Sequence, residues 1–147
     1  MEFSGTEIIK APREKVFDFL TDPQNFSSGI PDIKKVEVLS PEKFKVVAKL
    51  GISFLRGMFT IDFTVKEKES PSHARLTGHG TGVGSAIDLD INVDLEEDQS
   101  GNTVMKWRAE AKVAGMLASL GQRMLGSVAE KLVKEIFENI HKGIEKQ

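Results

Sequence analysis

The sequence contains no cysteine, no tyrosine and only one tryptophan, Trp107. Without cysteine there are no disulfide bonds, zinc–thiolate sites, iron–sulfur clusters or thiol nucleophiles. No apolar run approaches the ~20 residues that span a bilayer, and the N-terminus lacks the basic start and apolar stretch of a signal peptide. The net charge of -2 argues against a general nucleic-acid binder, which carries a strong basic excess. We therefore expect a cytoplasmic protein.

Size and composition are those of one globular domain. The chain has 147 residues, of which 39% are hydrophobic and 29% charged, a balance typical of soluble domains. No internal repeat, linker or low-complexity tract divides it. We predict a single domain over residues 1–147.

Alternating apolar and polar residues dominate the first two thirds of the chain and predict antiparallel strands. A first strand is predicted over residues 2–9. Two short helices should follow, one opening at Ala11-Pro12 and one at Asp22-Pro23, because proline suits the first helical turn and aspartate caps it. About six further strands should form a meander, since clusters of turn-forming residues separate the alternating segments.

A long amphipathic segment, about residues 115–146, closes the chain. Its apolar residues recur every four positions: Leu120, Met124, Val128, Leu132, Ile136, Ile140 and Ile144. This spacing predicts one helix roughly 45 Å long at ~1.5 Å per residue, longer than a strand of ~20 Å. A long helix laid across a curved antiparallel sheet encloses a cavity, so function is to be sought beneath its apolar face.

A run of alternating glycines at residues 78–84 does not fit a phosphate-binding loop. The run leads into a strand and not into a helix N-terminus, and the third glycine of that motif is missing. It predicts a bent or bulged strand end. Room for a ligand above bare backbone is the alternative.

The histidines and the acidic row are interpreted as surface features. His73 and His79, six residues apart on one strand, should lie ~20 Å from each other and cannot share a metal. His141 has no sequence neighbour that suggests a triad. The carboxylates of residues 88–98 lack the geometry of a calcium loop and predict a solvated acidic face. We predict no catalytic residue, no metal site and no cofactor.

The remaining candidates for function are apolar and form a predicted ligand site. Residue type alone favours ordinary core for them, because methionine and aromatic residues also fill core gaps. Glycines at residues 115, 121 and 126 cost ~1 kcal/mol each in a helix relative to alanine, so they favour close packing, a kink or a ligand. Residues 27–32 are the candidate gate. The predicted ligand-binding residues are Phe17, Phe26, Ile30, Pro31, Phe54, Met58, Trp107, Met116, Leu117, Leu120 and Met124.

Several segments resemble the CoxG family of carbon monoxide dehydrogenase subunits, and the resemblance covers essentially the whole chain. It implies the START-like (SRPBCC, polyketide cyclase/dehydrase and lipid transport) superfamily. The implied fold is an α+β helix-grip fold, also called Bet v1-like. In it a curved antiparallel sheet of about six to seven strands wraps a long C-terminal helix. The matching segments are residues 1–5, Ala-Pro-x-Glu-Lys-Val-Phe-Asp-Phe-Leu-Thr-Asp-Pro at 11–23, Ile30-Pro31, residues 78–85 and residues 106–125.

The resemblance also implies a function. It implies a non-enzymatic carrier for a quinone, isoprenoid or other lipid in a hydrophobic cavity, accessory to a molybdenum hydroxylase of the carbon monoxide dehydrogenase type. Transient contact with the inner face of a membrane is a further expectation. One alternative is a protein-docking or assembly factor without a ligand, and another is a cyclase- or lyase-type enzyme.

Two departures from the family limit what is carried over. The sequence stops at Gln147 directly after the predicted helix, so we expect no built-in membrane anchor. Many relatives have Cys-Ile-Pro-Gly where this sequence has Gly29-Ile30-Pro31-Asp32. The family has no agreed catalytic motif, and no catalytic residue is transferred.

Overall fold

Seven strands and four helical segments make up the computed structural model, which describes residues 1–52 and 55–145. The predicted residue Phe54 lies outside the described part. In chain order the elements are β1 (Glu2–Ile9), α1 (Arg13–Thr21), α2 (Pro23–Ser27), β2 (Ile33–Ser40), β3 (Lys43–Ile52), β4 (Leu55–Glu69), β5 (His73–Gly82), β6 (Ser85–Glu97), β7 (Thr103–Gly115), the 3-10 helix η1 (Met116–Leu120) and α3 (Gly121–Glu145).

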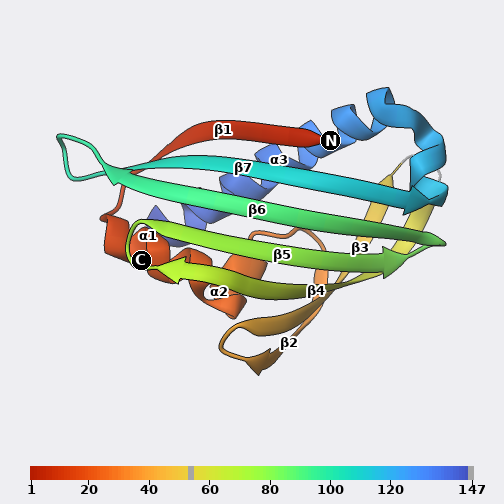
Figure 1. The fold of residues 1–147 in the computed structure, drawn as a ribbon, viewed down its shortest axis with the longest axis horizontal. Helices are drawn as coiled ribbons and strands as arrows, with labels where there is room; N and C mark the ends of the chain where they lie inside the picture. Colours follow the sequence, from red (N-terminus) through yellow and green to blue (C-terminus); the bar gives the residue numbers. More distant parts are fainter. Residues whose placement is uncertain (53–54, 146–147) are drawn as a thin grey trace.

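The strands form one antiparallel sheet in the order β1-β7-β6-β5-β4-β3-β2. Strands β2 to β7 follow each other as hairpins, whereas β1 pairs with the last strand, β7. The helices α1 and α2 carry the chain from one edge of the sheet to the other. Figure 1 shows α3 running along one face of the sheet, with α1 and α2 at one end of the molecule. The predicted sheet, two short helices and long C-terminal helix are confirmed.

Local sequence explains the start of both short helices. Pro12 stands at the N-cap of α1 in an extended conformation, with φ -63° and ψ 151°. Asp22 caps α2, and one of its carboxylate oxygens accepts a hydrogen bond from the backbone N–H of Asn25 at 2.9 Å. Pro23 follows at the first helical position, where a missing N–H costs nothing. These are the two helix starts that the sequence predicts.

The prediction that the long helix begins near residue 115 was wrong. Residues 116–120 form the separate turn η1, and α3 covers 25 residues, or about 37 Å at ~1.5 Å per residue. Gly115 and Gly121 flank η1 with φ of 80° and 84°, a left-handed conformation that interrupts an α-helix. A Cβ on Gly115 would also lie 2.3 Å from the carbonyl oxygen of Gly84. These two glycines are therefore explained by a sharp change of chain direction.

The core has two parts. The larger part lies between the sheet, α1 and the C-terminal half of α3, and it includes the fully buried Phe17, Phe44 and Ile144. The smaller part lies under η1, around Leu117 and Phe59. One sheet face and one helix face thus meet along the length of α3.

Two glycines of α3 provide a matched test of helix packing. A Cβ on Gly126 would meet nothing within 4 Å, whereas a Cβ on Gly143 would lie 2.7 Å from Cζ of the buried Phe19. We expect Gly126→Ala to raise the free energy of unfolding by about 0.5–1 kcal/mol, because alanine is the better helix former. We expect Gly143→Ala to lower it by roughly 1–3 kcal/mol through overpacking. Urea unfolding measures both, and equal shifts in the two variants would contradict this packing.

Candidate ligand-binding site

An internal cavity of about 200 Å³ lies between the sheet and α3. Every described residue that lines it is apolar. Three groups of residues contribute to the lining: Leu20, Phe26 and Ile30 from α1, α2 and the following loop; Leu50, Ile61, Phe63, Leu89, Ile91, Val93, Met105, Trp107 and Ala109 from the sheet; and Leu132, Val133, Ile136, Phe137 and Ile140 from α3. Such a surface binds hydrocarbon and offers no polar anchor.

The glycine run explains how large residues of β4 fit into this wall. Gly78 and Gly80 on β5 are buried, and a Cβ on them would lie 3.0 Å from the ring of Phe63 and 3.2 Å from Ile61. Phe63 and Ile61 therefore lie over bare backbone and face the cavity. The pairing of β4 with β5 is regular at the glycines, so the predicted bulge is not found there, and apolar side chains occupy the space above them.

Three of the predicted binding residues, Phe26, Ile30 and Trp107, line the cavity. Phe17 belongs to the core, with 2% of its surface exposed. Pro31 is half-buried in the loop after α2 and is not part of the lining. Leu120 packs against the buried Leu117 in the smaller core cluster, away from the cavity lining.

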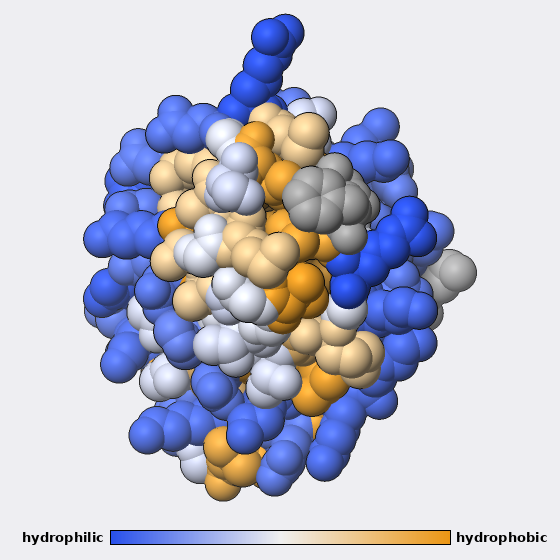
Figure 2. All heavy atoms as spheres, turned by 90° about the vertical axis from the view of Figure 1, so that its right-hand side faces the viewer, coloured by the Kyte–Doolittle hydropathy of each residue, from blue (hydrophilic) through white to orange (hydrophobic). Residues whose placement is uncertain are grey.

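The three predicted methionines lie outside the cavity. Met58, Met116 and Met124 are 48%, 48% and 43% exposed. Met116 lies beside Gly84, and the carbonyl of Met58 lies beside Gly82, so both are at the turn between β5 and β6. Figure 2 views this end of the molecule, where apolar side chains gather inside a hydrophilic border. We call the area around these three methionines the apolar end face.

The cavity-lining residues of α3 were missing from the predicted site. Sequence periodicity had placed them on the buried stripe, but nothing in the stripe distinguished its middle, at Leu132, Val133, Ile136 and Phe137, from its first turns. The useful signal was position, because the middle of a helix that crosses a curved sheet lies over the deepest part of the curve.

The loop after α2, which includes the predicted gate, is held against α3. The side-chain amide of Asn139 donates a hydrogen bond to the carbonyl of Gly29 at 3.2 Å. A Cβ on Gly29 would lie 3.1 Å from Cγ1 of Ile140. Ile30 then points into the cavity lining. Whether this loop opens stays a prediction.

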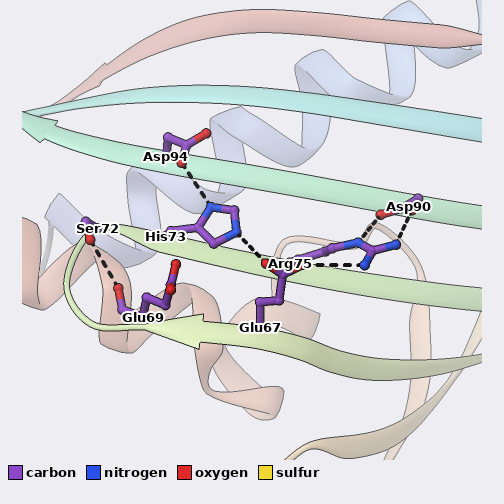
Figure 3. Close-up of polar contacts among 7 residues, drawn as sticks. All are labelled: Glu67, Glu69, Ser72, His73, Arg75, Asp90 and Asp94. Atoms are coloured by element: carbon purple, nitrogen blue, oxygen red, sulfur yellow. Dashed lines mark hydrogen bonds and ion pairs between the residues drawn. The ribbon is translucent and has the colours of Figure 1, made fainter.

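The acidic row of β6 is paired with cations of β5 on the outer face of the sheet (Figure 3). His73 hydrogen-bonds Asp94 at 2.9 Å and Glu67 at 3.3 Å. Arg75 donates two hydrogen bonds to Asp90, at 2.9 and 2.7 Å, which lower the pKa of that carboxyl. The prediction of a solvated acidic face therefore missed the cross-strand pairing, because the partners follow from the register of β5 and β6. The network joins strands and does not face the cavity.

His141 links α3 to the edge strand β1. Its Nε2 lies 3.2 Å from Glu7 on β1 and its Nδ1 lies 3.1 Å from Glu145 on α3. Glu145 also accepts a hydrogen bond from the backbone N–H of Lys10 at 3.1 Å. Burial lowers the pKa of His141, but its hydrogen bonds to Glu145 and Glu7 outweigh burial and raise the pKa above 6.5.

This raised pKa predicts a pH dependence of stability. A histidine with a raised folded-state pKa contributes stability that is fully present below its unfolded pKa of ~6.5 and is lost as pH rises through the folded pKa. The difference in melting temperature between the wild-type protein and His141→Gln should therefore be largest near pH 6 and shrink toward pH 8.5. His79→Gln is the control, because the His79 side chain is 56% exposed and should change the melting temperature less. A difference that is constant over this range would contradict the assignment.

A curved antiparallel sheet gripping a C-terminal helix, with an apolar cavity between them, defines the START-like helix-grip class. The chain belongs to the CoxG family of carbon monoxide dehydrogenase subunits, whose model matches residues 5–145. The family and fold that the sequence suggested are thus confirmed.

Solved structures agree with this class. A conserved protein from Geobacillus kaustophilus is 29% identical, with a TM-score of 0.91 over 99% of this chain and 96% of that one. A START superfamily protein from Mycobacterium smegmatis shares the fold at 11% identity, with a TM-score of 0.74 over 99% and 97% of the two chains. A protein from Thermus thermophilus does so at 10% identity, with a TM-score of 0.73 over 99% and 98%. A comparison with curated protein sequences finds no match. None of the helices in the described part of the chain has the length and apolar character needed to cross a membrane.

Proposed function

We propose that this protein is a non-enzymatic carrier that holds the apolar part of a quinone, isoprenoid or other lipid between its sheet and α3. The observation that carries the proposal is the internal cavity, whose described lining is entirely apolar. A cyclase- or lyase-type enzyme would need an ionisable group beside its substrate. Apolar walls favour retention of a ligand over chemistry on it.

The cavity volume limits what it holds. Ordinary ligand sites measure about 300–1,000 Å³, and an apolar cavity of about 150 Å³ binds benzene. At about 200 Å³ this cavity accommodates one ring or a short stretch of chain. A quinone or isoprenoid lipid would place one segment inside and the rest elsewhere.

The free energy of burial leads to the same expectation. Burying an aromatic ring of ~200 Å² at ~25 cal/mol per Å² contributes about 5 kcal/mol. Association costs at least ~4 kcal/mol in lost translational and rotational freedom. The cavity alone would therefore give millimolar affinity or weaker, and a tightly held ligand must bury further surface on this protein.

The proposed setting follows the family. The family description names carbon monoxide dehydrogenase, and we propose that the chain serves a molybdenum hydroxylase of this type in the cytoplasm. A quinone carried by it would exchange electrons or be exchanged at the inner face of the membrane. Fractionation of the host cell, with the protein followed by antibody in the soluble and membrane fractions, tests this setting.

Native mass spectrometry of the protein purified from its own host tests the carrier function. We expect a bound mass in stoichiometric amount, which solvent extraction releases as a quinone or lipid. A clean apo mass that persists after incubation with quinones and lipids would overturn the carrier function.

The apolar end face favours a second candidate, docking to a partner enzyme. Three exposed methionines lie there, and methionine-rich surfaces adapt to partner proteins. The segments that surround it, residues 49–60, 80–87 and 113–129, contain Lys49, Arg56 and Arg123 and no acidic residue. We propose that the partner surface is apolar with an acidic border.

Reversing the character of this face tests the docking candidate. Met116→Glu with Met124→Glu should abolish co-purification of the partner hydroxylase and leave the melting temperature within a few degrees. Leu39→Glu, at a 58% exposed position on β2, is the control. If all variants retain the enzyme equally, the end face is not the docking site.

A further inference from the structure

A groove of about 600 Å³ runs between β1 and α3. Its rim is polar, unlike the cavity. The charged residues that line it are Glu2, Glu7, Glu130, Glu138, Lys134 and His141. Carboxylates from both β1 and α3 thus face each other across the groove.

The groove and the cavity share one wall. Trp107, Val133 and Phe137 line both spaces. The rings of Trp107 and Phe137 are in contact, with centroids 5.1 Å apart and planes tilted by 44°. Two aromatic side chains and one valine therefore separate the apolar interior from the groove, and a change in their rotamers would join the two spaces.

Glycine on the edge strand allows Trp107 to close this wall. Gly5 pairs directly with Trp107 across β1 and β7. A Cβ on Gly5 would lie 2.9 Å from the indole Nε1, so only glycine lets the ring rest on β1. The same indole N–H is buried and has no hydrogen-bond partner among the described residues. Buried donors are normally satisfied, and this one offers a hydrogen bond to a polar atom of a ligand passing the wall.

The seam between β1 and α3 is fixed at one end. His141 contacts Glu7 at 3.2 Å, and the N–H of Lys10 donates to Glu145. The rings of Trp107 and Phe137 lie along the same seam. Side-chain rotation at the wall can therefore open a passage without release of the helix end.

We propose that the groove between β1 and α3 is the port of the cavity, that Trp107 and Phe137 are its gate, and that an amphipathic ligand rests its polar end on the groove rim. This inference rests on the proposed carrier function. It accounts for the ligand surface that the cavity cannot bury, because cavity and groove together reach the size of ordinary ligand sites, about 300–1,000 Å³.

The charges of the rim select the polar end of the ligand. Four carboxylates line the groove against one lysine and one histidine. A carboxylate or phosphate head group would meet net repulsion there. A neutral head group with carbonyl or hydroxyl oxygens, such as that of a quinone or an isoprenoid alcohol, suits both the rim and the unpaired indole N–H.

Fluorescence of Trp107 measures passage through the gate directly. It is the only tryptophan, and the chain has no tyrosine, so emission reports on the wall itself. Stopped-flow quenching by decylubiquinone gives the entry rate, and displacement into lipid vesicles gives the exit rate. We expect Phe137→Ala to raise both rates at least tenfold and to change Kd less than either rate.

Two variants on the same helix are the controls. Leu132 lines the cavity but not the groove, so Leu132→Ala should raise the exit rate and Kd and should not raise the entry rate. Asn139→Ala frees the loop at Gly29, the competing gate. If Asn139→Ala speeds entry and Phe137→Ala does not, the port lies at that loop and the inference is overturned.

A steric block covers the case in which Phe137→Ala does not fold. Because the chain has no cysteine, Lys134→Cys and Lys131→Cys are each labelled at one site with a bulky maleimide. Both positions are exposed on α3, but only Lys134 lines the groove. The label at position 134 should slow entry at least fivefold and the label at 131 should not. Equal rates would overturn the port, whereas a wild-type protein whose Trp107 emission responds neither to decylubiquinone nor to decanol would overturn the carrier function itself.

Discussion

Replacing Ala109 by phenylalanine should remove ligand retention while the fold remains intact. Ala109 lies on β7 and lines the cavity beneath α3. Its replacement adds a six-membered ring to a space of about 200 Å³, and benzene already fills an apolar cavity of about 150 Å³. We expect the stoichiometric ligand seen by native mass spectrometry to fall at least tenfold, and the melting temperature to stay equal or rise because a void is filled.

The same strand provides the control. Ala114 is exposed on β7, five residues from Ala109 and on the opposite face of the sheet. Ala114→Phe should retain the ligand. If Ala109→Phe lowers the melting temperature, Ala109→Leu, which adds three carbons, is the milder test. Full ligand retention in a folded Ala109→Phe protein would show that the cavity is not the binding site.

The architecture was predictable because each element has a local signature. Asp22-Pro23 marks the start of α2, alternation marks each strand, and a four-residue apolar repeat marks α3. The pairing of β1 with β7 is not local, and only the resemblance to the helix-grip class implied it. The apolar repeat also continued through residues 115–120, where two glycines with positive φ interrupt the helix. Periodicity does not reveal backbone conformation at glycine.

The site was less predictable than the fold. Alternation places Trp107 and Phe44 on the same inner face of the sheet, yet Trp107 lines a void and Phe44 is packed on all sides. The difference depends on the distance between sheet and helix at each point, and that distance is a property of sheet curvature. Residue type misled for the methionines, which were placed in the cavity as adaptable apolar residues but lie on the apolar end face. Cross-strand partners of His73 and His79 required the register.

Phe44→Ala should be among the most destabilising single substitutions in this chain. Phe44 is 1% exposed, stacks on Phe63 with ring centroids 5.1 Å apart, and meets the edge of Phe26 at 5.9 Å. Removing a fully packed ring leaves a cavity and costs about 3–5 kcal/mol. Guanidinium unfolding should show this loss with an unchanged slope. Leu39→Ala, at a 58% exposed position on β2, should stay within ~0.5 kcal/mol.

Trp107→Ala separates packed core from cavity wall. Trp107 borders empty space on two sides, in the cavity and in the groove, so its removal forfeits fewer contacts than removal of Phe44 despite its larger ring. We expect a loss of stability clearly smaller than that of Phe44→Ala, together with faster release of ligand. Phe26 and Phe63 line the cavity and rest on Phe44, so Phe44→Ala should also enlarge the cavity and weaken ligand retention. Equal losses of stability in the two variants would mean that Trp107 is ordinary core, and the gate would then have no free volume in which to move.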